Sequence, residues 1–185
     1  DYVLAGLYGT LTLNKNTGNY SYDVNNSNGT VNALSTGENL TETFGLVVSD
    51  GVNTSAQRSL TFKINGNNDA PGTITLSSST DAEKTVGATI GTLNATDPEG
   101  NSITYSVDSS NDGDKFEIIN GTTLKLKDTV SADYEATTSY SVTVNASDSN
   151  SQSQTTLTVN VVDTPIEPGE FQVSTDASND ADAVF

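Results

Sequence analysis

Apolar and polar residues alternate with a period of two over most of the chain. In the clearest case, Leu60, Phe62 and Ile64 are separated by single polar residues. Such alternation is typical of a strand with one buried face. The apolar clusters are short, and Ser, Thr, Asn, Gly and Val are abundant, which favours half-buried antiparallel strands over helices. The pattern therefore predicts an all-β protein.

The first 71 residues predict about five strands. A turn with Gly18 joins two of them into a hairpin, and residues 25–43 are expected to form a loop anchored by Val31 and Leu34. Five strands are few for a β-sandwich. We therefore expect the module of residues 1–71 to lack its first one or two strands, or to have its edge covered by a segment outside this chain. The expected strands are 2–4, 9–13, 19–24, 44–49 and 59–65.

Residues 72–163 predict a second module with seven strands, a number that suits an Ig-like sandwich. Residues 164–185 contain Pro165, Pro168, an expected short strand at 171–174 and an acidic run at 176–182, and they predict a linker and the start of a next module. The expected strands of the second module are 73–77, 89–96, 102–107, 115–118, 123–126, 139–147 and 155–162.

Parts of the first module recur in the second. The segment 48–50 (Val-Ser-Asp) corresponds to 146–148 (Ala-Ser-Asp), and the alternating strand 60–64 corresponds to 157–161. Residues 9–13 also resemble residues 121–126. A repeat of about ninety residues is long enough for each unit to bury its own core. The sequence thus predicts two tandem Ig-like antiparallel β-sandwiches, the first of them incomplete.

The strong negative charge of the chain limits the classes of molecule that it can bind. The net charge is −17, and it is uneven: residues 1–71 carry −3 and residues 72–185 carry −14. Such a surface repels phosphate backbones and anionic lipid, which argues against nucleic-acid binding. No run approaches the roughly 18 apolar residues of a spanning helix, so membrane insertion is not expected. Disorder is the competing interpretation of this composition, but the repeated alternation argues against it for all but the last twenty or so residues.

The composition also argues against an enzyme. The chain has no Cys and no His, which excludes a Ser-His-Asp catalytic triad and a Cys-His catalytic dyad. A glycosidase built on two carboxylates needs a deep cleft, which small sandwiches rarely offer.

Three acidic motifs of the second module point instead to metal binding. They are the turn with Asp97, Glu99 and Asn101, the pair Asp133 and Glu135, and Asp148 at the end of a strand. Two carboxylates at positions i and i+2 of extended backbone lie on the same side, and like charges so close are unfavourable without a cation between them. A Ca²⁺ ion takes about 6–8 oxygen ligands, so several motifs must converge. Solvated turns are the competing interpretation.

The connector between the modules supplies further oxygen ligands. Asn67, Asn68 and Asp69 lie there, followed by Pro71, which stiffens the backbone. An ordinary polar linker is the alternative. Strand directions predict that Asp97 and Asp148 reach the pole of the second module that faces this connector. At the opposite pole, beside the exit linker, we expect four acids: Glu83, Asp133, Glu135 and Asp163.

The second module resembles the cadherin repeat in its bacterial form. The matching segments are 83–87, 95–101, 133–135 and 146–148, together with the linker-like 67–71. The resemblance implies that these positions bind Ca²⁺ at module junctions and stiffen an array. The exit linker, 162–165, keeps Asp163 but lacks the Asn-Asp pair, so its junction is expected to bind fewer ions or to bind them weakly.

The first module resembles the VCBS repeat. The matching segments are 9–14, 20–22, 31–34, 37–38, 43–44, 49–51 and 68–71. Such repeats occur in long bacterial surface adhesins of the RTX type, so this resemblance implies an extracellular location, at the bacterial surface or secreted.

Two functional hypotheses follow. In the first, the chain consists of calcium-stiffened extender modules of an extracellular bacterial adhesin that supports cell adhesion or biofilm attachment. Its partners are then neighbouring modules of the same chain and, through the whole adhesin, a cell-surface glycan or protein. In the second, the incomplete first module or a loop binds a glycan, a peptide or an added strand.

Overall fold

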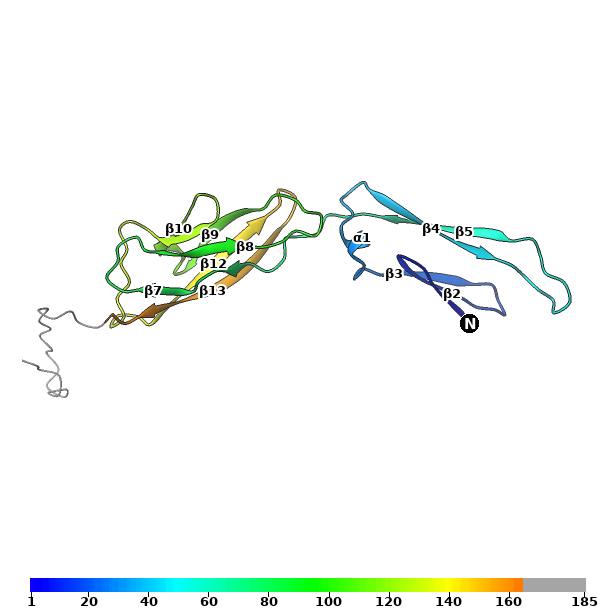
Figure 1. Cartoon of the computed structure of the whole chain (residues 1–185), viewed down its shortest axis with the longest axis horizontal. Coiled ribbons are helices and arrows are strands. Elements are labelled where there is room, and N and C mark those ends of the chain that lie inside the picture. Colours follow the sequence, from blue (N-terminus) through cyan, green and yellow to red (C-terminus); the bar gives the residue numbers. More distant parts are fainter. Residues whose placement is uncertain (165–185) are drawn as a thin grey trace, which may run out of the picture.

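The computed structural model describes residues 1–164, and almost all of its regular structure is β-strand. Strands β1–β5 form a first module and β6–β13 form a second, and the two lie end to end along the long axis of the molecule (Figure 1). The predicted all-β class with antiparallel sheets is confirmed. No helix within residues 1–164 has the length and apolar character needed to cross a membrane. The strand predicted at 171–174 and the acidic run at 176–182 lie outside the described residues.

The first module contains two antiparallel sheets. One has the order β1-β2-β3, and the other is the hairpin of β4 and β5. The expectation of a loop over 25–43 is wrong in part, because this segment contains a short helix and the start of β4. Glu42 occupies a buried position in β4, where a charged residue hides the alternation. The elements are β1 (Tyr2–Ala5), β2 (Gly9–Leu13), β3 (Tyr20–Val24), α1 (Gly29–Asn32), β4 (Asn39–Leu46) and β5 (Arg58–Asn65).

Strand β4 also ends earlier than predicted, at Leu46 rather than residue 49. Beyond it, the Oδ1 atom of Asp50 accepts hydrogen bonds from the backbone N–H groups of Val52 and Asn53, at 2.9 and 2.7 Å. A short polar side chain that bonds the backbone two and three residues further on turns the chain. The apolar residues Val47 and Val48 therefore lie in the exposed connection between β4 and β5.

Aromatic rings hold the two sheets of the first module together. Tyr22 of β3 stacks on Phe62 of β5 with ring centroids 4.3 Å apart, and Phe44 of β4 meets both rings edge-on. The Tyr22 hydroxyl donates a 2.5 Å hydrogen bond to the Oε2 atom of the buried Glu42. Tyr22 thus connects the two sheets through its ring and its hydroxyl.

The second module is a sandwich of two four-stranded sheets. Their orders are β10-β11-β8-β6 and β7-β13-β12-β9. Its strands are β6 (Thr75–Leu76), β7 (Thr80–Ala82), β8 (Thr89–Asn94), β9 (Thr104–Asn111), β10 (Phe116–Ile119), β11 (Thr123–Leu126), β12 (Ser139–Ser147) and β13 (Gln152–Val162).

The predicted strand at 73–77 is only part of what the structure contains. β6 pairs with β8 in one sheet, and then the chain crosses to the other sheet, where β7 pairs in parallel with β13. Strand β7 escaped prediction because its inward residue is Asp81, 4% exposed, so no apolar alternation marks it. This crossing makes the first segment of the module an edge of both sheets.

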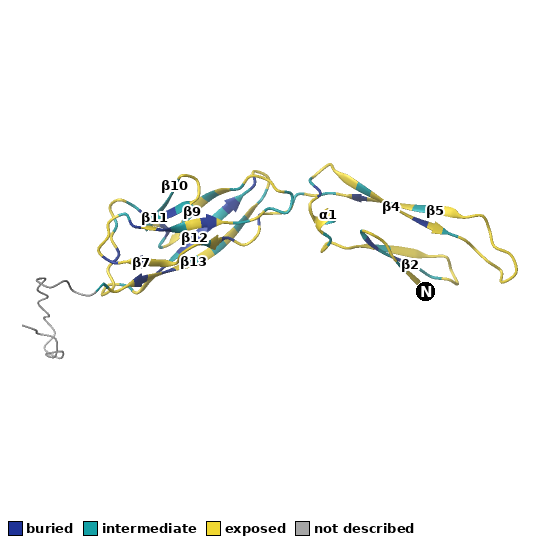
Figure 2. Cartoon of the chain, in the orientation of Figure 1, coloured by how far each residue is buried: buried dark blue, intermediate teal, exposed yellow. Residues whose placement is uncertain are grey.

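The core of the second module lies between its two sheets (Figure 2). Strand β12 contributes Tyr140, Val142, Val144 and Ala146, which follow the period-two pattern and are all buried. Phe116 packs edge-on against Tyr140 with ring centroids 5.8 Å apart. This core fixes both ends of the sandwich, from which the acidic loops project.

Candidate metal centres

At the pole of the second module that faces the first, here called the entrance pole, the connector contacts both modules. The backbone N–H of Asn68 donates to Oγ1 of Thr36 in the first module, at 3.0 Å. Its side-chain Nδ2 donates to Oδ2 of Asp148 at 2.8 Å and to Oγ of Ser151 at 2.7 Å, both in the second module. One asparagine thus joins two β-rich bodies.

A second connector residue reaches another loop at this pole. The backbone N–H of Asp69 donates to Oε1 of Glu99 at 3.2 Å, and its carbonyl oxygen accepts from Oγ of Ser151 at 3.2 Å. The connector thus hydrogen-bonds to Asp148 through Asn68 and to Glu99 through Asp69, although among residues 1–164 no group of three carboxylates within 4.8 Å of one another occurs at this pole.

Asp148 is 6% exposed and its carboxylate is fully engaged. Oδ1 accepts from the backbone N–H groups of Asn150 and Ser151, both at 2.7 Å. The bond from the Ser151 backbone and the amide of Asn68 are the main causes that lower its pKa to about 2. Asp148 is thus held as an anion at neutral pH, which is the state a cation requires.

The turn predicted around Asp97 and Glu99 is present, and it follows β8. Oδ1 of Asp97 accepts from the backbone N–H groups of Glu99 and Asn101, at 3.1 and 3.0 Å, and these bonds shape the turn. The other oxygens, Oδ2 of Asp97 and Oε2 of Glu99, are enclosed and have no hydrogen-bond partner. Enclosed carboxylate oxygens without a donor are costly unless a cation or water satisfies them.

Two predicted ligands contribute less at this pole. Asn101 takes part through its backbone N–H, and its side chain is exposed. The side chain of Asn67 is also exposed and makes only a 3.4 Å bond to the carbonyl oxygen of Asn68. Neither side chain contacts another acidic loop within the described part of the chain.

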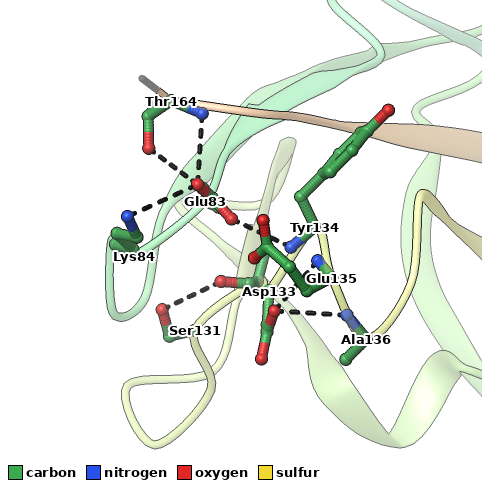
Figure 3. A network of polar contacts seen from close by, with 9 residues as sticks. Glu83, Lys84, Ser131, Asp133, Tyr134, Glu135, Ala136 and Thr164 are labelled. Carbon is green, nitrogen blue, oxygen red and sulfur yellow. Dashed lines mark hydrogen bonds and ion pairs between the residues drawn. The ribbon is translucent and has the colours of Figure 1, made fainter. Parts of the chain in front are cut away.

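At the opposite pole, here called the exit pole, Glu83 receives the exit linker (Figure 3). Glu83 is 3% exposed. Its Oε1 atom accepts from the backbone N–H and Oγ1 of Thr164, at 3.1 and 2.9 Å, and its Oε2 atom accepts from the backbone N–H of Tyr134 at 3.0 Å. These bonds, first that from Tyr134, lower the pKa of Glu83 to about 2.

Three carboxylates gather at the exit pole, as predicted. One oxygen each of Glu83, Glu135 and Asp163 lies within 4.8 Å of the others. Asp133 lines the same hollow, but its Oδ1 atom accepts from the backbone N–H groups of Glu135 and Ala136, so this pair too lies in a turn. The turn directs Glu135 toward Glu83, while one oxygen of Asp133 is used locally (Figure 3).

A lysine lies beside the exit pole. The Nζ atom of Lys84 is 3.6 Å from Oε1 of Glu83 and offers a positive charge to the cluster. The Lys84 side chain is 45% exposed, so water screens part of this charge, and the remainder opposes the binding of a second cation.

Both poles present the same kind of donor. All the candidate ligand atoms are carboxylate, amide or backbone oxygens, and the chain has no His or Cys to provide softer ligands. Oxygen donors with several negative charges suit a hard cation such as Ca²⁺. The unsatisfied oxygens of Asp97 and Glu99 fit the same requirement at the entrance pole.

Sequence reasoning missed Thr36, Ser151 and Thr164, three hydroxyl residues that fasten the linkers. Ser151 carried a signal, because it lies three residues after Asp148, the spacing at which an Asp side chain bonds the backbone of a turn. Nothing in the sequence marked Thr36 and Thr164, because their hydrogen-bond partners are distant in sequence.

Residues 77–162 match the family model described as Cadherin domain, so the second module is similar to a cadherin repeat. No curated protein matches the chain. Among solved structures, PcdhgB3 EC1-4 is similar with a TM-score of 0.52 and 21% identity, covering 84% of this chain and 37% of its own. Human Protocadherin-24 EC1-2 is similar in two crystal structures. The first has 26% identity and a TM-score of 0.43, and the match covers 51% of this chain and 44% of that one. The second, Form II, has 20% identity and a TM-score of 0.49, and the match covers 83% of this chain and 77% of that one.

The chain thus spans less than half the length of the first two of these structures. The likeness to PcdhgB3 EC1-4, at 21% identity, establishes the fold.

Proposed function

We propose that this chain is a pair of extender modules of an extracellular bacterial adhesin, stiffened by Ca²⁺ at the poles of the second module. Its immediate partners are the neighbouring modules of the same polypeptide. Attachment to a cell-surface glycan or protein, and any role in biofilms, belongs to the whole adhesin. The first module takes the part of a VCBS-like repeat and the second that of a cadherin-like repeat.

The observation that carries the proposal is the chemistry of the entrance pole. Oδ2 of Asp97 and Oε2 of Glu99 are enclosed without a donor, in a loop whose Glu99 contacts the connector. Asp148 provides a third carboxylate, held ionised, beside Asn68 of the same connector. Like charges placed on neighbouring loops at a junction repel one another in the absence of a cation.

Stiffening follows from which parts supply the ligands. Asp97, Glu99 and Asp148 belong to the second module, whereas Asn68 and Asp69 belong to the connector, which is itself bonded to Thr36 of the first module. A cation held by both parts binds only when they are aligned, so it shifts the population toward the aligned arrangement. Bound Ca²⁺ supplies positive charge that offsets the carboxylates of this pole. The hydrogen bonds of Asn68 and Asp69 set the direction of the connector.

The exit pole is proposed as a second, weaker site. Glu83, Glu135 and Asp163 would hold the ion there, with Asp133 nearby. The linker supplies a single carboxylate, Asp163, and the nearby ammonium of Lys84 opposes cation binding. We therefore expect lower affinity at this pole than at the entrance pole.

Small-angle X-ray scattering with Ca²⁺ and with excess chelator tests the stiffening. We expect the maximum dimension of the two-module chain to be larger and better defined with Ca²⁺, because the connector is then fixed. Calorimetric titration on the same samples counts the ions. An unchanged maximum dimension together with no binding heat would refute the proposal.

Matched variants assign the effect to the entrance pole. Asp97→Asn with Glu99→Gln is expected to lower Ca²⁺ affinity by at least tenfold and to abolish the change in dimension. Asp114→Asn removes a charge from an exposed side chain that belongs to neither pole and serves as the control. Equal loss in the control would show that net charge, and not the pole, is responsible.

A further inference from the structure

The internal repeat allows the strands of the two modules to be compared one by one. Residues 60–64 in β5 correspond to 157–161 in β13, and the segment after β4 corresponds to the end of β12. In the second module, each of these strands has another partner: β12 pairs antiparallel with β9, and β13 pairs in parallel with β7. Within residues 1–164, β4 and β5 pair only with each other. In that part of the chain, the outer edges of β4 and β5 are thus unpaired, whereas the matching edges of β12 and β13 are paired.

Burial shows the consequence of these open edges. The first module buries only four apolar side chains, Leu11, Leu34, Phe44 and Ile64. The continuous core cluster of the structure lies wholly in the second module. Apolar side chains remain exposed in the first, such as Val3 at 68%, Leu7 at 75% and Val48 at 76%. A domain of about seventy residues needs most of its apolar surface to be buried for stability.

We infer that the first module is completed by an extended segment of the same polypeptide, N-terminal to β1, that pairs with the free edge of β4 as β9 pairs with β12. A second extended piece of that segment lies along β5, as β7 lies along β13.

The order of strands identifies the source of this segment. In the second module, β7 and β9 both precede the half formed by β10–β13. Residues 9–13 in β2 resemble 121–126 around β11, so the equivalents of β7 and β9 are expected before β1. One edge of β2 is paired with β3, and the corresponding edge of β11 is paired with β8. No further strand can therefore pair with β2 at that edge. Among residues 1–164 the outer edge of β3 is also unpaired, because β6, which lies beside β8, has no counterpart there; the equivalents of β7 and β9 belong along β4 and β5.

The edges are suited to pairing. Strands β4 and β5 are eight residues long and regular, with an unbroken antiparallel register from Asn39↔Asn65 to Leu46↔Arg58. Long, regular edges bind another strand readily unless something covers them. The first module carries only −3 of the net charge, so repulsion does not oppose an added strand. An occupant with alternating apolar residues would cover Phe62 and Leu60, which are half-buried. This inference is independent of the calcium proposal.

Hydrogen exchange of backbone amides tests the inference. It is measured on residues 1–185 and on the natural protein with its upstream sequence included. We expect the amides of β4 and β5 to exchange at least tenfold more slowly in the longer chain, while those of β12 and β13, already covered on both sides, change little. A first module that is unfolded alone and folded in the longer chain would support the inference as strongly.

Equal exchange of β4 and β5 in both chains would overturn it. Light scattering adds a second criterion. If residues 1–185 form a dimer that protects β4, and the upstream sequence does not displace the second copy, then the edge is an interface between molecules and the assignment to an upstream segment is wrong.

Discussion

Asp112 shows how one carboxylate organises its surroundings. Its Oδ2 atom accepts from the backbone N–H of Ser141 at 2.9 Å, and its Oδ1 atom pairs with Nζ of Lys115 at 2.8 Å. The stretch from Asp108 to Gly113 looks like the start of a calcium loop, but position 119 is Ile where such a loop needs Glu. In the structure this stretch is the end of β9 followed by a turn at Asp112, which is tied to β12. The Lys115 ammonium lies 5.9 Å from the ring centroid of Tyr140.

These contacts predict a dependence of stability on pH. The hydrogen bond from Lys115, followed by that from Ser141, lowers the pKa of Asp112 below its ordinary 3.8. A carboxyl group with a lowered pKa stabilises the folded state above its unfolded pKa, and this contribution is lost as the pH falls below about 4. We expect Asp112→Asn to reduce stability near neutral pH by about 1 kcal/mol and to weaken the loss of stability in acid.

Thermal unfolding between about pH 6 and 3, in chelator, measures this effect. Asp114→Asn is the control, because Asp114 is mostly exposed and lies 3.6 Å from the same lysine. A wild-type and an Asp112→Asn curve that run parallel through the acid range would contradict the assignment.

At the scale of elements, the turn between β1 and β2 depends on Glu42 of β4. The carboxylate accepts hydrogen bonds from the backbone N–H of Leu7 and Tyr8 and from the hydroxyl of Tyr22. Burial, and then the bond to Glu42, raises the pKa of Tyr22. Gly6 allows this close approach, since a Cβ atom there would overlap the Glu42 carboxylate. One buried acid therefore connects the sheet of β1–β3 to the β4–β5 hairpin.

Glu42→Ala is expected to destabilise the first module by roughly 1–3 kcal/mol, because it leaves the partly buried backbone donors of the β1–β2 turn and the Tyr22 hydroxyl without an acceptor. Glu38→Ala is the matched control, since the exposed Glu38 side chain accepts only from the nearby Ser35 backbone. Tryptophan is absent, so tyrosine fluorescence and amide exchange of β2 report on the module. Equal stability of the two variants would show that Glu42 is not a structural support.

Prediction from the sequence worked where the core itself creates the pattern. Strands β2, β11 and β12 were placed correctly to the residue because alternate side chains enter a core. It failed where a carboxylate takes an inward position, as at Glu42 and Asp81, because the alternation is then hidden. The grouping of Glu83, Glu135 and Asp163 at the exit pole could be predicted from strand direction, whereas the hydroxyl contacts of Thr36 and Thr164 depend on the final path of the linkers.

At the scale of the whole molecule, the two modules differ in how much they bury. The second has a continuous core between two four-stranded sheets, and the first has two smaller sheets joined by an aromatic cluster. The contacts of Asn68 and Asp69 between them are few and polar. The modules are therefore expected to unfold separately.

Differential scanning calorimetry in chelator should show two transitions, with the first module unfolding at the lower temperature. Residues 72–164 alone should reproduce the upper transition, which identifies it. A single transition that is lost when the first module is removed would contradict this expectation, since it would mean that the two units fold as one.

The parallel pairing of β7 with β13 has a mechanical consequence. The entrance linker leads through β6 into β7, and β13 leads out into the exit linker. The two strands run in the same direction and are paired from Thr80↔Asn160 to Ala82↔Val162. Tension along the chain would therefore pull β7 backward and β13 forward, loading all the bonds of this short ladder in shear at the same moment. A module built in this way resists rupture better than one whose terminal strands peel apart bond by bond.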